Sequence, residues 1–303
     1  KGQLVASASQ EGAPAWARWS PDGKAAMVVW AGEDEFRLDV VTLDDGKRRQ
    51  VAECKVLAMA LWSPDGKIVS VAEAGAGGVE LKVIEVAEGS EKSVLASCAS
   101  SHQWTPDGKI VAFQPNQDEG DADGRVLLVD PAGAEPRPVA VARAEATTVL
   151  SLSPDGKRLL MVEKRDDNDS LVRIDLADGA REVLVAEGAN AGIWSPDGKR
   201  IAITRGDSNG DGLTLMVTDA DGKQPKPLAT GLMRDTGEPK EAMPVYLSWA
   251  GNDTLLFFRK VAVYGTSGKS MRLFRANVES GDVEDLQSAI EGAVAAALKP
   301  KEK

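Results

Sequence analysis

The chain of 303 residues carries a formal net charge of −11, with 47 acidic against 36 basic residues. This balance argues against a nucleic-acid surface, which needs clustered Lys and Arg. No apolar run approaches the roughly 20 residues that a membrane-spanning helix requires, so we expect no membrane insertion. The hydrophobic content of 43% is typical of a folded protein. Because the sequence begins at Lys1, we expect a processed product whose signal peptide has been removed.

A hexapeptide, Trp-Ser-Pro-Asp-Gly-Lys or a close variant, recurs along the chain with 42 to 48 residues between consecutive copies. The copies span residues 19–24, 62–67, 104–109, 152–157 and 194–199, and a decayed copy spans 249–253. A period in the forties indicates a repeat architecture. Within each copy, Pro sets the first turn position, Asp tolerates the second, and Gly supplies a positive φ, so we expect a tight hairpin turn.

Each turn is followed by a short apolar run rich in β-branched residues and then by a second hairpin that contains Gly, as at residues 36–53. Every unit therefore reads as four short antiparallel strands, here called a to d, and six units predict a six-bladed β-propeller. The expected blades span residues 14–53, 54–97, 98–144, 145–187, 188–239 and 240–286.

The two ends of the chain do not follow the repeat. Residues 1–12 contain a strand-like run, Gln3 to Ala8, which we expect to join the last blade and close the ring; a frayed terminal strand is the alternative. Residues 287–303 are rich in Ala and Lys. Ile290, Val294 and Leu298 have helical spacing, which predicts a short C-terminal helix and a disordered end.

The repeated WSPDGK motif, followed by an apolar strand and a hairpin with Asp-Gly, resembles the repeats of TolB-like propellers, also described as PD40 repeats. The resemblance covers Trp16 to Leu286. It implies a six-bladed propeller, often periplasmic or secreted in bacteria and often a protein-binding module. Related propellers cap the active site of prolyl-oligopeptidase-type peptidases, so an accessory domain of a larger peptidase or surface complex is an alternative.

The aromatic residues divide into two groups. We expect the anchor tryptophans to form inter-blade core: Trp19, Trp62, Trp104, Trp194 and Trp249. Four others fall outside the anchor position and are candidates for exposed contacts: Trp16, Trp30, Tyr246 and Tyr264.

The b–c loops vary most between units and are strongly acidic. Since these loops share one face of a propeller, we expect that face and the mouth of the channel to bind a protein partner. The proposed contact residues are Glu33, Asp34, Glu35, Asp166, Asp167 and Asp169.

Two of these loops have oxygen ligands at alternate positions, as calcium loops do. One contains Asp207, Asn209 and Asp211, and the other contains Glu119, Asp121 and Asp123. No Glu stands at the twelfth position of the first loop, so a solvated acidic hairpin tip is the competing interpretation. No cofactor is required by this reading, but Ca²⁺ is a possible one.

Two features bear on chemistry. Cys54 and Cys98 precede successive anchors at similar distances, so they form either a disulfide or two buried free thiols. The chain has a single histidine, His102, which argues against a Ser-His-Asp site, and no other catalytic set is evident. We therefore expect a non-enzymatic protein-binding propeller; a calcium-assisted small-ligand binder or a lactonase-like hydrolase is the alternative.

Overall fold

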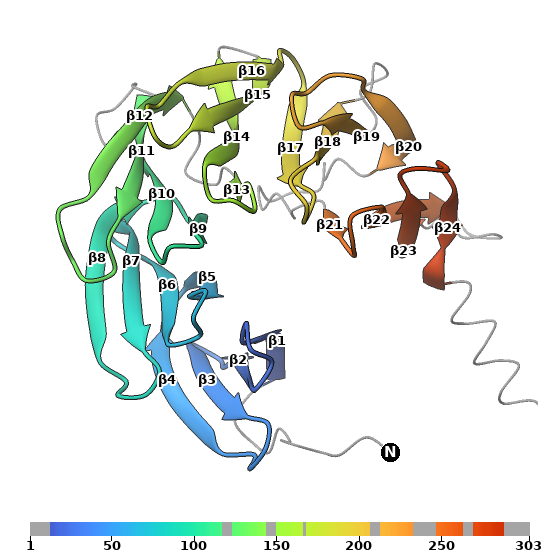
Figure 1. Cartoon of the computed structure of the whole chain (residues 1–303). Coiled ribbons are helices and arrows are strands. Elements are labelled where there is room, and N and C mark those ends of the chain that lie inside the picture. Colours follow the sequence, from blue (N-terminus) through green and yellow to red (C-terminus); the bar gives the residue numbers. More distant parts are fainter. Residues whose placement is uncertain are drawn as a thin grey trace, which may run out of the picture. The chain divides into compact units, whose positions relative to one another are not determined.

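The computed structural model describes residues 13–116, 123–143, 150–165, 168–206, 213–232, 247–262 and 269–287. These residues form six four-stranded antiparallel sheets, each with consecutive strands as neighbours, which confirms the expected six-bladed β-propeller class (Figure 1). The chain divides into two compact units, one of residues 1–159 and 174–180 and the other of residues 160–173 and 181–303.

The first three sheets follow the predicted a-to-d order. Sheet 1 contains β1 (Ala13–Trp19), β2 (Ala25–Ala31), β3 (Phe36–Thr42) and β4 (Arg48–Cys54). Sheet 2 contains β5 (Leu57–Trp62), β6 (Ile68–Gly75), β7 (Gly78–Glu85) and β8 (Glu91–Cys98). Sheet 3 contains β9 (His102–Trp104), β10 (Ile110–Pro115), β11 (Asp123–Val129) and β12 (Arg137–Arg143).

The last three sheets repeat the same pattern. Sheet 4 contains β13 (Ser151–Leu152), β14 (Arg158–Arg165), β15 (Asn168–Asp175) and β16 (Arg181–Val185). Sheet 5 contains β17 (Ala189–Trp194), β18 (Arg200–Gly206), β19 (Leu213–Asp219) and β20 (Lys226–Leu232). Sheet 6 contains β21 (Leu247–Trp249), β22 (Thr254–Ala262), β23 (Lys269–Asn277) and β24 (Val283–Asp285).

The repeated hexapeptide forms the a–b turn, and its side chains close the turn. In the first copy, Ser20 Oγ donates to Asp22 Oδ1 at 2.7 Å, and the backbone N–H of Lys24 donates to the same oxygen at 3.0 Å. Gly23 has a backbone φ of 69°, which residues with a side chain rarely adopt. These bonds lower the pKa of Asp22, first through Ser20 and then through the Lys24 backbone. The same Ser-to-Asp bond recurs at Ser63, Ser153 and Ser195, so this part of the motif is structural.

Apolar cores lie between consecutive sheets. In the first unit, Met27, Val29 and Leu38 of sheet 1 pack with Val69 and Ile84 of sheet 2. A second core joins sheets 2 and 3, and in the second unit a third core joins sheets 5 and 6. Because a single sheet cannot bury both of its faces, each one is stabilised by its neighbours, as expected for a repeat array.

The predicted terminal elements fall largely outside the described residues. The closing strand within residues 1–12 is among the residues that are not described, and so is most of the C-terminal helix. Leu286 and Gln287 have helical backbone where the description ends. Among the described residues, no helix has the length and hydropathy to cross a bilayer.

Candidate functional site

The anchor indoles bind the preceding sheet through a bond that the sequence does not reveal. Trp62 Nε1 donates to the carbonyl oxygen of Arg18 at 3.2 Å, and Trp249 Nε1 donates to that of Ile193 at 3.3 Å. Arg18 and Ile193 each directly precede the anchor tryptophan of the previous sheet. These two tryptophans therefore link neighbouring a strands as well as packing against the inter-sheet cores.

Trp19 was predicted to be inter-blade core, and this prediction is wrong. Its side chain is 67% exposed. Sheet 1 is the first sheet of the chain, and no earlier described sheet of its unit covers this indole. Trp62 and Trp194 are buried as expected, and Trp104 and Trp249 are half-buried.

Of the aromatic residues predicted to be exposed contacts, Trp30 is buried, so that prediction is wrong. Trp30 is only 5% exposed, because the guanidinium carbons of Arg48 and Arg37 lie 4.9 Å and 5.8 Å from its ring centroid. Arg48 Nε in turn donates to the buried carboxylate of Asp39 at 2.5 Å. Trp16 is half-buried and packs against the core of sheets 1 and 2. Tyr246 and Tyr264 lie outside the described residues.

The single histidine forms a pair with a serine, which would be the arrangement of a nucleophile and its base. His102 Nε2 lies 2.7 Å from Ser70 Oγ, and Trp104 Nε1 donates to the same hydroxyl at 2.8 Å. Both Ser70 and His102 are 0% exposed. Burial, and then the charge of Arg18, lowers the pKa of His102 to about 4. The ring is therefore neutral near pH 7, and the pair is closed to any substrate, which is the environment of a structural hydrogen bond.

The acidic loop between β2 and β3 lies on the surface, as the proposed partner contact requires. Glu33, Asp34 and Glu35 are all exposed. The carboxylate of Glu53, at the end of β4, raises the pKa of Glu35 through its charge and a shared hydrogen bond. Gln50 Nε2 donates to Glu53 Oε2 at 3.0 Å. The loop carboxylate of Glu35 thus lies beside the exposed carboxylate of Glu53 on β4.

Most of the remaining predicted acidic residues lie outside the described residues. These are Asp166, Asp167, Asp207, Asn209, Asp211, Glu119 and Asp121. Asp169 is described and lies half-buried in β15. Asp123 forms an ion pair with Arg143, with 2.6 Å between Oδ1 and Nε. Within the described part of the chain, no group of three or more His, Cys, Asp or Glu side chains is arranged to hold a metal ion.

The two cysteines are buried free thiols, so the disulfide considered from the sequence is not formed in the structure. Cys54 closes β4 and Cys98 closes β8, each at the outer strand of its own sheet. Burial raises the pKa of each thiol to about 11. Both side chains therefore act as small apolar groups.

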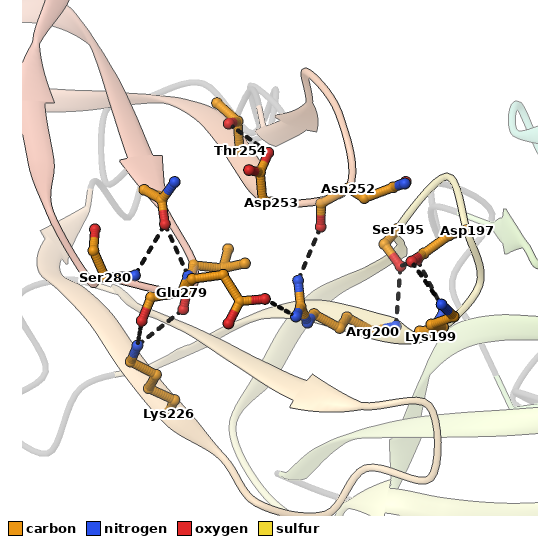
Figure 2. Close-up of polar contacts among 12 residues, drawn as sticks. Ser195, Asp197, Lys199, Arg200, Lys226, Asn252, Asp253, Thr254, Glu279 and Ser280 are labelled. Atoms are coloured by element: carbon orange, nitrogen blue, oxygen red, sulfur yellow. Dashed lines mark hydrogen bonds and ion pairs between the residues drawn. The ribbon is translucent and has the colours of Figure 1, made fainter.

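Basic side chains at the outer strands clamp the c–d turn of the following sheet, and no sequence prediction anticipated them. Figure 2 shows this between sheets 5 and 6, where Lys226 Nζ donates to the carbonyl oxygens of Val278 at 2.9 Å and Glu279 at 2.7 Å. Arg200 adds a bond of 3.1 Å to the carbonyl oxygen of Asn252 and an ion pair with Glu279.

Equivalent clamps join sheets 1 and 2, sheets 2 and 3, and sheets 3 and 4. Arg49 Nη1 donates to the carbonyl oxygen of Val86 at 3.0 Å, and Arg137 Nη2 donates to that of Leu176 at 3.0 Å. Lys92 donates to the carbonyl oxygen of Ala132. The available signal was a Lys or Arg that follows the c–d glycine by three or four residues, as Arg49 follows Gly46.

Comparisons with known proteins agree with this architecture. The turns, the four-stranded sheets and the inter-sheet indoles define a six-bladed β-propeller of the PD40-repeat class. A family model described as the TolB β-propeller domain matches residues 3–246, and the chain belongs to this family. No curated protein sequence matches the chain.

Three solved structures show how widely the fold is shared. TolB from Acinetobacter baumannii is 20% identical with a TM-score of 0.51; the match covers 68% of this chain and 51% of TolB, so it spans about half the length of that protein. An oligogalacturonate lyase from Vibrio parahaemolyticus is 14% identical with a TM-score of 0.63, covering 91% and 78% of the two chains. The β-propeller domain of the Trilobed protease from Pyrococcus furiosus is 15% identical with a TM-score of 0.61, covering 90% and 81%. At these identities the similarity shows the fold alone.

Proposed function

We propose that the chain is a non-enzymatic propeller module that binds a protein partner through its b–c loops. The observation that carries this proposal is the exposed acidic loop of sheet 1. There the carboxylate of Glu35 is close enough to that of Glu53 for their negative charges to repel each other. Among the described residues, no Lys or Arg forms an ion pair with Glu33, Asp34, Glu35 or Glu53. A basic segment of a partner would relieve the repulsion between these carboxylates, so charge complementarity favours a cationic partner.

Two further points support the proposal. The chain belongs to the TolB β-propeller family, and resemblance to that family implies protein binding and an extracytoplasmic location. Ser70 and His102 are both buried from solvent, so a substrate cannot reach the serine hydroxyl. The calcium-assisted ligand binder and the accessory peptidase domain remain alternative proposals.

The test compares partner capture by two charge-reversed variants. In the first, Glu33, Asp34 and Glu35 are all replaced by Lys. In the matched control, the same replacement is made at three exposed carboxylates in or directly beside the c–d turns: Glu85, Glu88 and Glu135. We expect the loop variant to weaken affinity for the captured protein by roughly tenfold or more, and the control to bind as wild type does. Equal binding by both variants would refute the loop as the contact surface.

A further inference from the structure

A cavity of about 540 Å³ opens in the first unit between the end of β8 and the strands β10, β11 and β12 of sheet 3. Cavities that bind small molecules have volumes of about 300–1,000 Å³. The cavity is lined by Ala96, Ser97, Gln114, Pro115, Asn116, Asp123, Gly124, Arg125 and Val141. It is separate from the acidic loop of sheet 1 and from the sealed Ser70–His102 pair. Its lining includes Asp123, one of the residues of the second calcium-like loop.

The floor of the cavity is one row of cross-strand neighbours. Gln114 pairs with Arg125, and Arg125 pairs with Val141. Directly paired residues of antiparallel strands point to the same face of the sheet. Gln114 Nε2 donates to the carbonyl oxygen of Ala96 at 3.0 Å, which fixes this face against β8. The guanidinium of Arg125 therefore stands between an amide and an apolar side chain that is 67% exposed.

The opposite wall is an irregular end of β8. The register of β7 and β8 shifts between Val79 and Leu81, and Ser97 takes a φ of 53° there. A positive φ is unfavourable for a residue with a Cβ, and such conformations are often found at binding sites. The Ser97 hydroxyl donates to the carbonyl oxygen of Gly77 over 3.3 Å, which is a long bond. Ser97 is one of the residues that line the cavity, and rotation of its hydroxyl away from this long bond would free a donor for a ligand.

The charged side chains that line the cavity favour an anionic ligand. The carboxylate of Asp123 is neutralised by its cross-strand neighbour Arg143, at 2.6 Å. Arg125 is exposed, and no carboxylate among the described residues forms an ion pair with it. Elsewhere in the chain Arg173 is paired with both Glu182 and Asp221. One positive charge therefore remains at the cavity, and a guanidinium can bind a carboxylate through two parallel hydrogen bonds.

We propose that this cavity binds a carboxylate carried on a short aliphatic chain. The carboxylate pairs with Arg125 and accepts a hydrogen bond from Ser97, and the aliphatic chain packs against Ala96, Pro115 and Val141. Such a group occurs in free dicarboxylic acids and in the glutamate side chain of a protein. The chemistry is the same for both sources, so the experiment separates them.

The test is a titration of ¹⁵N-labelled protein followed by the backbone amide resonances of Ser97, Arg125 and Val141. The probes are glutarate and the blocked peptide acetyl-Ala-Glu-Ala-amide, and glutaramide is the uncharged control. We expect saturable shifts at these amides with at least one carboxylate probe and none with glutaramide. Saturation by glutarate would identify a free acid as the source, and saturation by the peptide alone would identify a protein side chain.

Two variants make the assignment specific. Arg125→Gln removes the charge, and Arg205→Gln removes another exposed strand arginine, in the second unit. We expect the first variant to weaken binding by roughly tenfold or more while its melting temperature stays at the wild-type value, and the second to bind normally. The proposal is overturned if neither carboxylate probe gives saturable shifts, or if Arg125→Gln binds as tightly as wild type.

Discussion

Lys226 Nζ lies 2.7 Å from the carbonyl oxygen of Glu279, so a side chain of the outer strand of sheet 5 closes the c–d turn of sheet 6 (Figure 2). The bond joins residues 53 positions apart in the sequence, the first residue of a d strand and a residue of the c–d turn in the next repeat. The same relation holds for Arg49 and the carbonyl oxygen of Val86 in the first unit. In sheet 4 the clamping residue is Arg173 of the c strand, whose Nη1 donates to Asp221 Oδ1 of sheet 5 at 3.0 Å. The contact between a basic side chain and the c–d turn of the next sheet therefore recurs, although the residue type and the strand that supply it vary.

Removing one clamp is expected to weaken the contact between two sheets. Lys226→Met keeps the aliphatic chain and removes the ammonium that binds Val278 and Glu279. Because Lys226 is exposed and water can replace the lost bonds, we expect the free energy of unfolding to fall by only about 0.5–1.5 kcal/mol. Urea unfolding measures this. Lys223→Met, at an exposed position in the c–d turn of sheet 5 that precedes Lys226, is the control and should change stability by less. Equal effects of both changes would contradict a role for the clamp.

The buried histidine should make stability depend on pH. The pKa of His102 is about 4 in the folded chain, and a histidine in an unfolded chain has a pKa near 6.5. The unfolded state therefore binds more protons between these values, so the free energy of unfolding falls as pH decreases from about 6.5 to 4. A difference of this size corresponds to roughly 3 kcal/mol. Urea unfolding at pH 7, 6 and 5 measures the loss.

The variant His102→Asn isolates this contribution, since Asn can hydrogen-bond to Ser70 but does not titrate. Its unfolding free energy should be lower than that of wild type at pH 7 and should depend less on pH between 6.5 and 5. Carboxyl groups titrate mainly below this window, so they do not mask the effect. A wild-type stability that stays constant from pH 7 to 5 would show that the ring is not buried as the structure has it.

The sequence predicts those parts of the fold that repeat. Pro, Asp and Gly stabilise each a–b turn through contacts within the turn itself. The turn at Gly23 and its two strands can therefore be predicted without knowing which sheet packs beside them. Trp19 shows the limit, because its burial depends on which sheet covers it, and that is not a property of the motif. Trp30 shows a second limit: it is covered by arginines that a buried aspartate holds, and pairing across three strands cannot be seen in a linear pattern.

The candidate site was less predictable for the same reason. The acidic loop at Glu33 could be located because its charges are adjacent in sequence. Arg125 could not be singled out, since its significance comes from Asp123 being paired with Arg143 on the neighbouring strand. The Ser70–His102 pair joins two repeats, and only its complete burial distinguishes a structural bond from a catalytic one.

The free thiols give a direct chemical test. Because both cysteines are buried and their pKa values are raised to about 11, neither should react readily with a thiol reagent in the native protein. We expect both to react fully once the protein is unfolded in denaturant without reductant. Counting thiols with Ellman's reagent before and after unfolding measures this. If unfolding exposes no thiol until a reductant is added, Cys54 and Cys98 are joined by the disulfide that the structure lacks.

The wall of the Arg125 cavity depends on a glycine that has no room for a side chain. A Cβ on Gly124 would lie 2.3 Å from Phe113 Cζ and 2.6 Å from the backbone oxygen of Gln114, and Phe113 is fully buried. Neither atom can withdraw without moving the core of sheet 3, so Gly124→Ala should lower the free energy of unfolding by about 1–3 kcal/mol. Gly75→Ala is the matched control, because a Cβ there would meet nothing within 4 Å. Urea unfolding of both variants decides the point: a Gly124→Ala protein as stable as the Gly75→Ala protein would mean that β10 and β11 lie farther apart than the structure places them.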